Sequence, residues 1–533
     1  MNGIGGNGTA LFRSSGYAER SAGHRPLLPR LFVPIQVAAV SLSLVYVAAF
    51  IYVVCRTLWY PFPLEWMEGG TLAVTQRILD GAPLYVEPSI DYVPYIYPPL
   101  YYYAAAAAAS VLGLDFLAPR LVSLVATVGC GCMIYRICVE ETGDRVLAIC
   151  GAGLFFAMFD VAGKWFHTAR VDMLNLLFLL VAVYAARFRS GFLSALAIAA
   201  SLGLAFWTKQ SSILLAMPVL ASMLAFGRCR ALVAITAFLA AIVTPAVLLH
   251  EASDGWSTYF LFDLPRSHEI DWQYLLTFWT KDLLPQIGLA LCLAIAGMIA
   301  TASVDRAAAA IYGAVFLGLV GSAWAARLHS GSFRNVDLPA FAVLCILAPI
   351  GVARLRDMLA TRLVPVTKPG AVHIATGAML VLQLIALAYN PQAAVPSRLD
   401  TAAGERFLAY LAAADGDVLL PDLPFVQART GKRTYGLGMA ASDVLRGPDS
   451  SGRRALRESL AEAIRARRFS AIVLNERGAN IPPALHESYR FAGRIFDDRT
   501  SFFPVTGWPT RPNLVFVPAI RPPAAQGLRT GSR

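Results

Sequence analysis

The sequence has 533 residues, of which 57% are hydrophobic and only 15% are charged. A water-soluble fold with this composition would lack polar groups for its surface, so an ordinary soluble protein is excluded and a chain that crosses a membrane many times is indicated. The formal net charge of +11 does not indicate nucleic-acid binding, because the basic residues are spread over short loops and form no single basic face.

The N-terminal part is expected to be a disordered cytoplasmic tail followed by a membrane span. Residues 1–30 are rich in Gly, Ser and Arg, and residues 31–55 form an uncharged apolar run of 25 residues. This run is longer than the core of a signal peptide and has no small-residue cleavage site after it, so we expect it to be retained as the first span. All eight cysteines lie in or beside apolar runs, which argues against a disulfide framework.

Residues 31–390 are predicted to form an α-helical polytopic membrane domain of about eleven spans. Several of the apolar runs are short, but arginines at their ends can extend toward the aqueous boundary. The runs lie near 31–55, 119–138, 146–163, 171–187, 191–207, 211–226, 231–249, 283–301, 307–326, 337–353 and 371–390.

The distribution of charge fixes the expected orientation of these spans. If the Ala-rich stretch from Leu100 to Leu114 is an interfacial helix and not a span, fifteen basic residues fall in the N-terminal tail and the loops on its side. This matches the tendency of cytoplasmic loops to carry Lys and Arg. We therefore expect the N-terminus in the cytoplasm and the C-terminal part outside, with interfacial helices at about 65–79 and 98–114.

Residues 391–533 are much more polar and are predicted to form a small α/β domain on the outer face. The segments "DVLLPDL" (417–423), "SAIVLNE" (470–476), "RIFDD" (494–498) and "NLVFVPA" (513–519) are typical of short strands, and a charged helix is expected near 453–468.

The first outer loop carries the first candidate catalytic residues. Glu65 and Glu68 are spaced to share one face of the helix expected at 65–79. One carboxylate of such a pair can act as a general base while the other raises its pKa or binds an ion. The alternative is a solvated interfacial helix with negative charges near its N-terminus, and the spacing alone favours that alternative.

Each later outer loop contributes at least one cation. Arg170 and Asp172 lie where one span begins, and Lys209 lies in a turn between two apolar runs. Such charges at a membrane edge have two explanations. They are functional, or they form an ion pair and extend their ends toward the aqueous boundary. The two longer outer loops add further candidates for substrate binding, namely Arg266, His268, Arg327, Arg334 and Asn335. Single histidines in such loops are more often structural than metal ligands, and their spacing is not that of a zinc site.

Acidic residues on one outer loop and cations on the next four form a combination that can hold an anionic lipid phosphate and deprotonate a hydroxyl group beside it. The sequence contains no Gly-rich nucleotide loop and no Ser/His/Asp hydrolase motif. A lipid-linked donor is therefore favoured over a nucleotide.

This pattern resembles the GT-C membrane glycosyltransferases, in particular the branch of protein O-mannosyltransferases, lipid A aminoarabinose transferases and rhizobial galacturonosyltransferases. The resemblance covers about residues 31–390. It is carried by the motifs "EWMEGG", "LDGAPLY", "YPPLYYY", "ARVD" and "WTKQ".

The resemblance implies inverting transfer of a sugar from a polyprenyl-phosphate donor to a hydroxyl group of an envelope lipid, glycan or protein. It implies that the first-loop acid is catalytic, with Glu68 as base, Glu65 as its support and Asp172 as a further candidate. Tyr97 takes the place of the Lys or His that usually precedes Pro-Pro in the family. A divalent metal ion is left open as a cofactor. We expect a multi-pass protein of the bacterial inner membrane, with residues 391–533 in the periplasm.

Two other function classes are consistent with a polytopic chain. A transporter would show charged or interrupted helices in mid-membrane, often in repeated halves, whereas here the charges lie at span ends. A membrane scaffold that binds partners through its C-terminal domain would tolerate loss of the first-loop acids, whereas a transferase would not.

Overall fold

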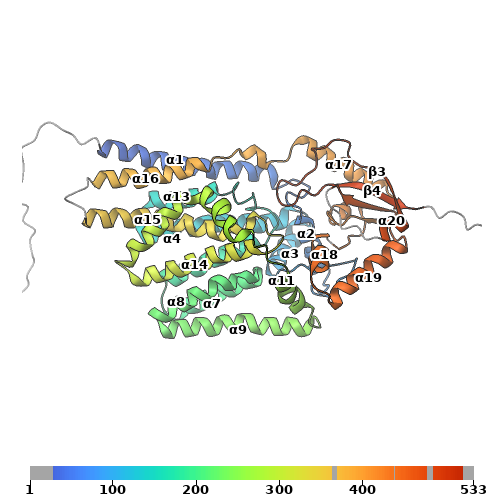
Figure 1. Ribbon diagram of the computed structural model, residues 1–533, viewed down its shortest axis with the longest axis horizontal. Helices are drawn as coiled ribbons and strands as arrows, with labels where there is room; N and C mark the ends of the chain where they lie inside the picture. The colour runs from blue at the N-terminus through green and yellow to red at the C-terminus, as the bar shows by residue number, and fades with distance from the viewer. Residues whose placement is uncertain (1–27, 363–368, 437, 477–483, 520–533) are drawn as a thin grey trace, which may run out of the picture.

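The computed structural model describes residues 28–362, 369–436, 438–476 and 484–519. Residues 1–27 of the expected N-terminal tail and residues 520–533 therefore lie outside the described part, and residues 28–30, which the sequence predicted to be part of the tail, are helical. The molecule is elongated, with a bundle of apolar helices at one end and a smaller unit that contains all the strands at the other (Figure 1).

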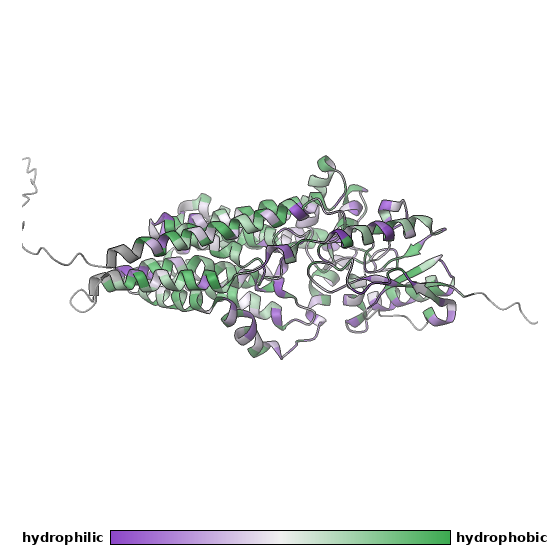
Figure 2. Ribbon diagram, turned by 90° about the horizontal axis from the view of Figure 1, so that it is seen from above, coloured by the Kyte–Doolittle hydropathy of each residue, from purple (hydrophilic) through white to green (hydrophobic). Residues whose placement is uncertain are grey.

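The bundle is built from the segments that the sequence predicted to be spans, since each of the eleven apolar runs lies largely in one helix, although the runs 146–163 and 371–390 extend beyond the ends of theirs. These helices are α1 (Leu28–Thr57), α4 (Leu117–Thr142), α5 (Arg145–Ala157), α6 (Asp172–Phe188), α7 (Gly191–Thr208), α8 (Ile213–Phe226), α9 (Arg228–Ala252), α13 (Leu284–Ala302), α14 (Arg306–Leu328), α15 (Leu338–Arg362) and α16 (Pro369–Ala386). Apolar residues dominate this half of the molecule and become mixed with polar ones toward the strands (Figure 2).

Seven helices of the described residues are long and apolar enough to cross a membrane, or eight if the bent pair Ala371–Ala386 and Pro391–Ala413 is one span. Two of the remaining predicted spans, α5 and α8, lie in shorter apolar helices. The number of eleven spans therefore stays a prediction, while a helical polytopic bundle is confirmed.

Two short helices lie where the bundle meets the strand-containing unit. α2 (Glu68–Leu79) and α3 (Leu100–Leu112) correspond to the two expected interfacial helices. Glu65, however, precedes α2 and lies in a turn closed by the amide of Glu68, which donates to the Glu65 carbonyl at 3.0 Å. The expectation that Glu65 and Glu68 share one helical face is therefore wrong.

Shorter helical segments shape the other outer loops. They are η1 (Gln210–Ser212), α10 (Trp256–Thr258), η2 (Tyr259–Asp263), α11 (Leu264–Ser267), α12 (Tyr274–Thr277), η3 (Phe278–Leu283) and η4 (Arg334–Asp337). All of them connect helices of the bundle.

The C-terminal unit contains a four-stranded sheet in the order β1-β2-β4-β3. β1 (Val418–Leu419) is parallel to β2 (Ala471–Asn475), whereas β4 (Pro512–Pro518) is antiparallel to both β2 and β3 (Tyr489–Arg494). The helical segments of the unit are η5 (Pro391–Ala394), α17 (Arg398–Ala413), η6 (Val426–Thr430), α18 (Gly438–Arg446), α19 (Ser451–Arg465) and α20 (Ala484–Ser488).

The predicted strand "RIFDD" is wrong, because β3 ends at its first residue, Arg494. The amides of Ile495 and Phe496 donate to the side-chain oxygen of Asn513 at 2.9 and 2.7 Å. This side chain intervenes in the ladder and ends the strand. The predicted charged helix is confirmed as α19.

Candidate active site

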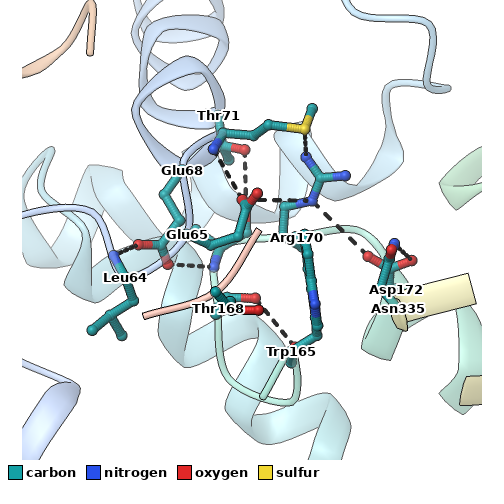
Figure 3. Close-up of polar contacts among 12 residues, drawn as sticks. Leu64, Glu65, Glu68, Thr71, Trp165, Thr168, Arg170, Asp172 and Asn335 are labelled. Atoms are coloured by element: carbon teal, nitrogen blue, oxygen red, sulfur yellow. Dashed lines mark hydrogen bonds and ion pairs between the residues drawn. The ribbon is translucent and has the colours of Figure 1, made fainter. Parts of the chain in front are cut away.

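Glu68 is fully buried and its carboxylate accepts four hydrogen bonds, of which the one from Leu64 is drawn in Figure 3. Its Oε1 accepts from Nε of Arg120 at 3.0 Å and from the amide of Ala169 at 2.7 Å. Its Oε2 accepts from Nη2 of Arg120 and from the amide of Leu64, both at 2.7 Å. Burial alone would raise the pKa of Glu68, but the Arg120 cation and these donors hold it below its ordinary value.

The sequence analysis missed Arg120, the partner of Glu68. Arg120 lies in the first turns of α4 with no exposed surface, and its guanidinium also donates to the carbonyls of Tyr60 and Phe62, each at 2.7 Å. The available signal was an arginine just inside an apolar run, where an unpaired charge is costly. Arg120 and Glu68 together fix the chain that leaves α1.

Glu65 is equally buried but has few partners. Its Oε2 accepts from the amide of Met67 at 3.0 Å and lies 4.0 Å from Nε of Arg170. Oε1 of Glu65 has no hydrogen-bond partner in the part of the chain that the structure describes. Burial raises the pKa of this carboxyl group to about 8, against the opposing effect of the Arg170 cation.

Arg170 connects Glu65 to a second group of polar residues. Its Nε lies 4.0 Å from Oδ2 of Asp172, and its Nη2 donates to the hydroxyl group of Tyr97 at 3.2 Å. Asp172 in turn accepts from Nζ of Lys209 at 2.8 Å and from the side-chain nitrogen Nδ2 of Asn335 at 3.0 Å. The predicted candidates from different loops are thus brought together around Arg170.

A cavity of about 1140 Å³ lies between the outer ends of the bundle and the C-terminal unit. This volume exceeds the roughly 300–1,000 Å³ of a typical small-ligand pocket, so the cavity has room for parts of two substrates. The sequence-predicted residues that line it are Tyr97, Arg170, Lys209, Arg327, Arg334 and Asn335. Side chains of β1, β2, α18 and α19 form the opposite wall.

Asp282, like Arg120, is a residue of the site that the sequence analysis missed. It accepts from Nε of Arg327 and lies against Nη1 of Arg334, both at 2.8 Å. A second buried acid, Asp337, lies 3.7 Å from Nη1 of Arg334, so two cations and two acids meet in this part of the site.

Two predicted residues do not join the site. Arg266 is exposed and is not among the residues that line the cavity. His268 is buried outside the cavity lining, and its ring nitrogens contact the carbonyl of Asp443 at 3.2 Å and Nη2 of Arg446 at 3.3 Å. Burial, followed by the Arg446 cation, lowers the pKa of His268 to about 4. Its contacts are those of a packing residue between the fourth outer loop and α18.

Within the described ranges, no three His, Cys, Asp or Glu side chains gather closely enough to hold a metal ion. Asp172 and Asp282 are instead engaged by Lys209 and Arg327. The described side chains therefore do not fit a resident metal ion.

The fold and site define a polytopic membrane protein with a cavity, lined by apolar side chains and several cations, between its helix bundle and its strand-containing unit. The sequence model of the dolichyl-phosphate-mannose-protein mannosyltransferase family matches residues 97–250. A search among curated proteins gave no match.

Solved structures show which fold this is. The chain is similar to ArnT from Cupriavidus metallidurans bound to undecaprenyl phosphate, with 14% identity, a TM-score of 0.56, and coverage of 90% of this chain and 98% of that one. The apo state of the same protein matches with 15% identity, a TM-score of 0.56, and coverage of 89% and 97%. The chain thus has the ArnT-like fold, and the resemblance to GT-C glycosyltransferases is confirmed.

Proposed function

We propose that this chain is a membrane glycosyltransferase that moves a sugar from a polyprenyl-phosphate donor to a hydroxyl group of an envelope lipid, glycan or protein. The observation that carries the proposal is the buried Glu65, whose unpartnered oxygen lies close to a cavity lined by five Lys and Arg side chains. The likeness to an ArnT structure that contains undecaprenyl phosphate supports the class of donor.

Four of these cations are assigned to bind the phosphate group of the donor. Arg170 and Lys209 come from neighbouring loops and are held in place by Asp172, while Arg327 and Arg334 are held by Asp282. Charge-assisted hydrogen bonds from such groups are about twice as strong as neutral ones and favour a phosphate that gains negative charge as it leaves. Tyr97 and Asn335 are assigned to orient Arg170 and Asp172 through the hydrogen bonds described above.

The geometry favours exchanging the roles that the sequence suggested for the two first-loop acids. Glu68 has no free lone pair for a substrate and is assigned to position the loop through Arg120. Glu65 has a free oxygen and a raised pKa, as expected of a general base. Asp172 is bound to Lys209 and is assigned to position the cations.

In the proposed step, Glu65 as carboxylate takes the proton of the acceptor hydroxyl. The acceptor oxygen forms a bond to the anomeric carbon while the bond from that carbon to the phosphate oxygen breaks. The electron pair leaves with the phosphate, which the cations hold as polyprenyl phosphate. Attack from the face opposite the phosphate inverts the anomeric centre.

The test is turnover of a labelled polyprenyl-phosphate sugar by purified protein, with mass spectrometry of envelope lipids and glycans from a deletion strain to identify the product. A positioned general base contributes about a hundred- to ten-thousandfold, so Glu65→Gln should lose that factor while binding of undecaprenyl phosphate persists. A transporter or a scaffold would show no turnover in the wild-type protein. Absence of turnover in the wild-type protein would therefore reject the proposal.

A further inference from the structure

A segment of the C-terminal unit, Val505–Trp508, is attached to the same backbone that carries Glu65. The amide of Thr506 donates to the carbonyl of Leu64 at 3.2 Å, and Thr506 and Glu65 form an isolated parallel bridge. The hydroxyl group of Thr506 also donates to the carbonyl of Gly163 in the next outer loop. The segment is therefore held at two outer loops of the bundle, at one by a backbone hydrogen bond and at the other by a side-chain hydrogen bond.

Gly507 of this segment packs directly against Glu65. A methyl group on Gly507 would lie 2.4 Å from Cδ1 of Trp66 and 2.9 Å from Oε1 of Glu65, both too close for a carbon atom. The residue also has a φ of +81°, which side chains other than glycine rarely adopt. The oxygen of Glu65 that has no hydrogen-bond partner thus faces the Cα of a glycine.

The segment also separates Glu65 from the cavity. Trp66, Met67 and Trp508 line the cavity, and Trp508 keeps 47% of its surface exposed. Glu65 itself is 0% exposed and is not part of the lining. An acceptor hydroxyl in the cavity cannot reach Oε1 of Glu65 unless this cover moves.

We propose that Thr506–Trp508 is an acceptor gate, and that Gly507 is a positioning residue, because the lack of a side chain lets the segment pack closely over Glu65 and Trp66 without displacing them. This rests on the proposed function, because it assigns a route to the base of that reaction. The C-terminal unit thereby becomes part of the catalytic machinery. The hydrogen bonds of Thr506 with Leu64 and Gly163 together hold the gate closed, and the loss of the Gly163 contact increases the access of the cavity to Glu65.

The first experiment compares Gly507→Ala with Gly431→Ala. Gly431 is a matched control because it belongs to the same unit, has a φ of +73° and has nothing within 4 Å of the added methyl group. A displacement of about 1 Å at a reacting group can cost about a hundredfold in rate. Gly507→Ala should therefore lower transfer by about ten- to a hundredfold, with undecaprenyl phosphate binding unchanged, whereas Gly431→Ala should transfer at the wild-type rate. Wild-type transfer in Gly507→Ala would overturn the proposal.

The second experiment does not depend on turnover. A water-soluble carbodiimide modifies protonated carboxyl groups, and at pH 6 Glu65 is protonated because its pKa is raised to about 8. Thr506→Val removes the hydroxyl group but keeps the shape of the side chain, so modification of Glu65, read by peptide mass spectrometry, should become several-fold faster. Gly431→Ala should leave the modification rate unchanged.

The two experiments separate failure of the gate from failure of the proposed function. Equal modification of Glu65 in the wild type and in Thr506→Val would reject the gate, whatever the activity. Faster modification in Thr506→Val, together with full transfer activity in Glu65→Gln, would support the movable cover but reject Glu65 as base and Gly507 as a positioning residue.

Discussion

Glu68 and Arg120 form an ion pair with two hydrogen bonds, of 3.0 and 2.7 Å, and neither side chain has any exposed surface. The pair joins the chain that leaves α1 to the beginning of α4. Removing one member of a buried ion pair leaves an uncompensated charge, which costs more than the pair contributes to stability. Glu68 is therefore expected to affect folding, in contrast to Glu65.

Glu68→Gln is expected to lower the free energy of unfolding by about 3–5 kcal/mol, because the Arg120 cation loses its counter-charge. Glu65→Gln is the matched control, since it makes the same substitution at another buried acid. Glu65→Gln should leave the free energy of unfolding at pH 7 unchanged or raise it. The reason is that burial disfavours the charged form of Glu65, and a glutamine carries no charge. Chemical unfolding in detergent measures both. Equal losses in the two variants would contradict the different roles assigned to the two acids.

The pH dependence of transfer should follow the ionisation of Glu65. A base acts in its deprotonated form, and the pKa of this group is raised from 4.5 to about 8 by burial. The value of kcat/KM for the donor should thus rise about tenfold per pH unit below about pH 8 and stay constant above that pH. A rate that is constant between pH 6 and 8 would exclude Glu65 as the base.

Stability should change in the opposite direction over the same range. Because the folded state holds the Glu65 proton more tightly than the unfolded state, the stabilisation is complete below about pH 4.5 and is lost as the pH rises to about 8. Glu65→Gln should remove this contribution. The check is the difference between wild-type and variant unfolding free energies from pH 5 to pH 8.5.

Replacing a cation that lines the cavity should lower the affinity for the donor, whereas replacing a cation of an outer loop outside the cavity should not. Arg334 lines the cavity and is 37% exposed, so Arg334→Ala should fold and lose about ten- to a hundredfold in affinity for undecaprenyl phosphate. Arg266→Ala is the control, because Arg266 is an exposed arginine that does not line the cavity. Equal affinities for the two variants would remove Arg334 from the phosphate site.

Sequence patterns predicted the helices of the bundle and the gathering of Arg170, Lys209 and Arg334 at one cavity, although Arg266 does not join them, because apolar runs and loop charges follow directly from the membrane as a solvent. They did not predict how the two acids divide their roles. That division depends on Arg120, which lies 52 residues from Glu68, and on Gly507 of the C-terminal unit. Such contacts are set by tertiary packing, and the local spacing of two glutamates carries no information about them.

Orientation in the membrane is the remaining prediction. α1 and α16 begin, and α15 ends, at the end of the bundle far from the strands (Figure 1). Other basic residues of the predicted cytoplasmic loops are paired there, since Glu141 binds Arg187 at 2.8 Å and Arg354 at 2.5 Å. The positive-inside tendency then puts this end in the cytoplasm and the cavity outside.

Reporter fusions test this orientation. Fusions at Asp144 and Gly227 should report a cytoplasmic location, and fusions at Gly255 and Gly416 an external one. Because the loops alternate between the two ends of the bundle, an external signal at Gly227 would invert every later loop. The cavity would then face the cytoplasm, and a donor presented on the outer leaflet would be on the wrong side of the membrane.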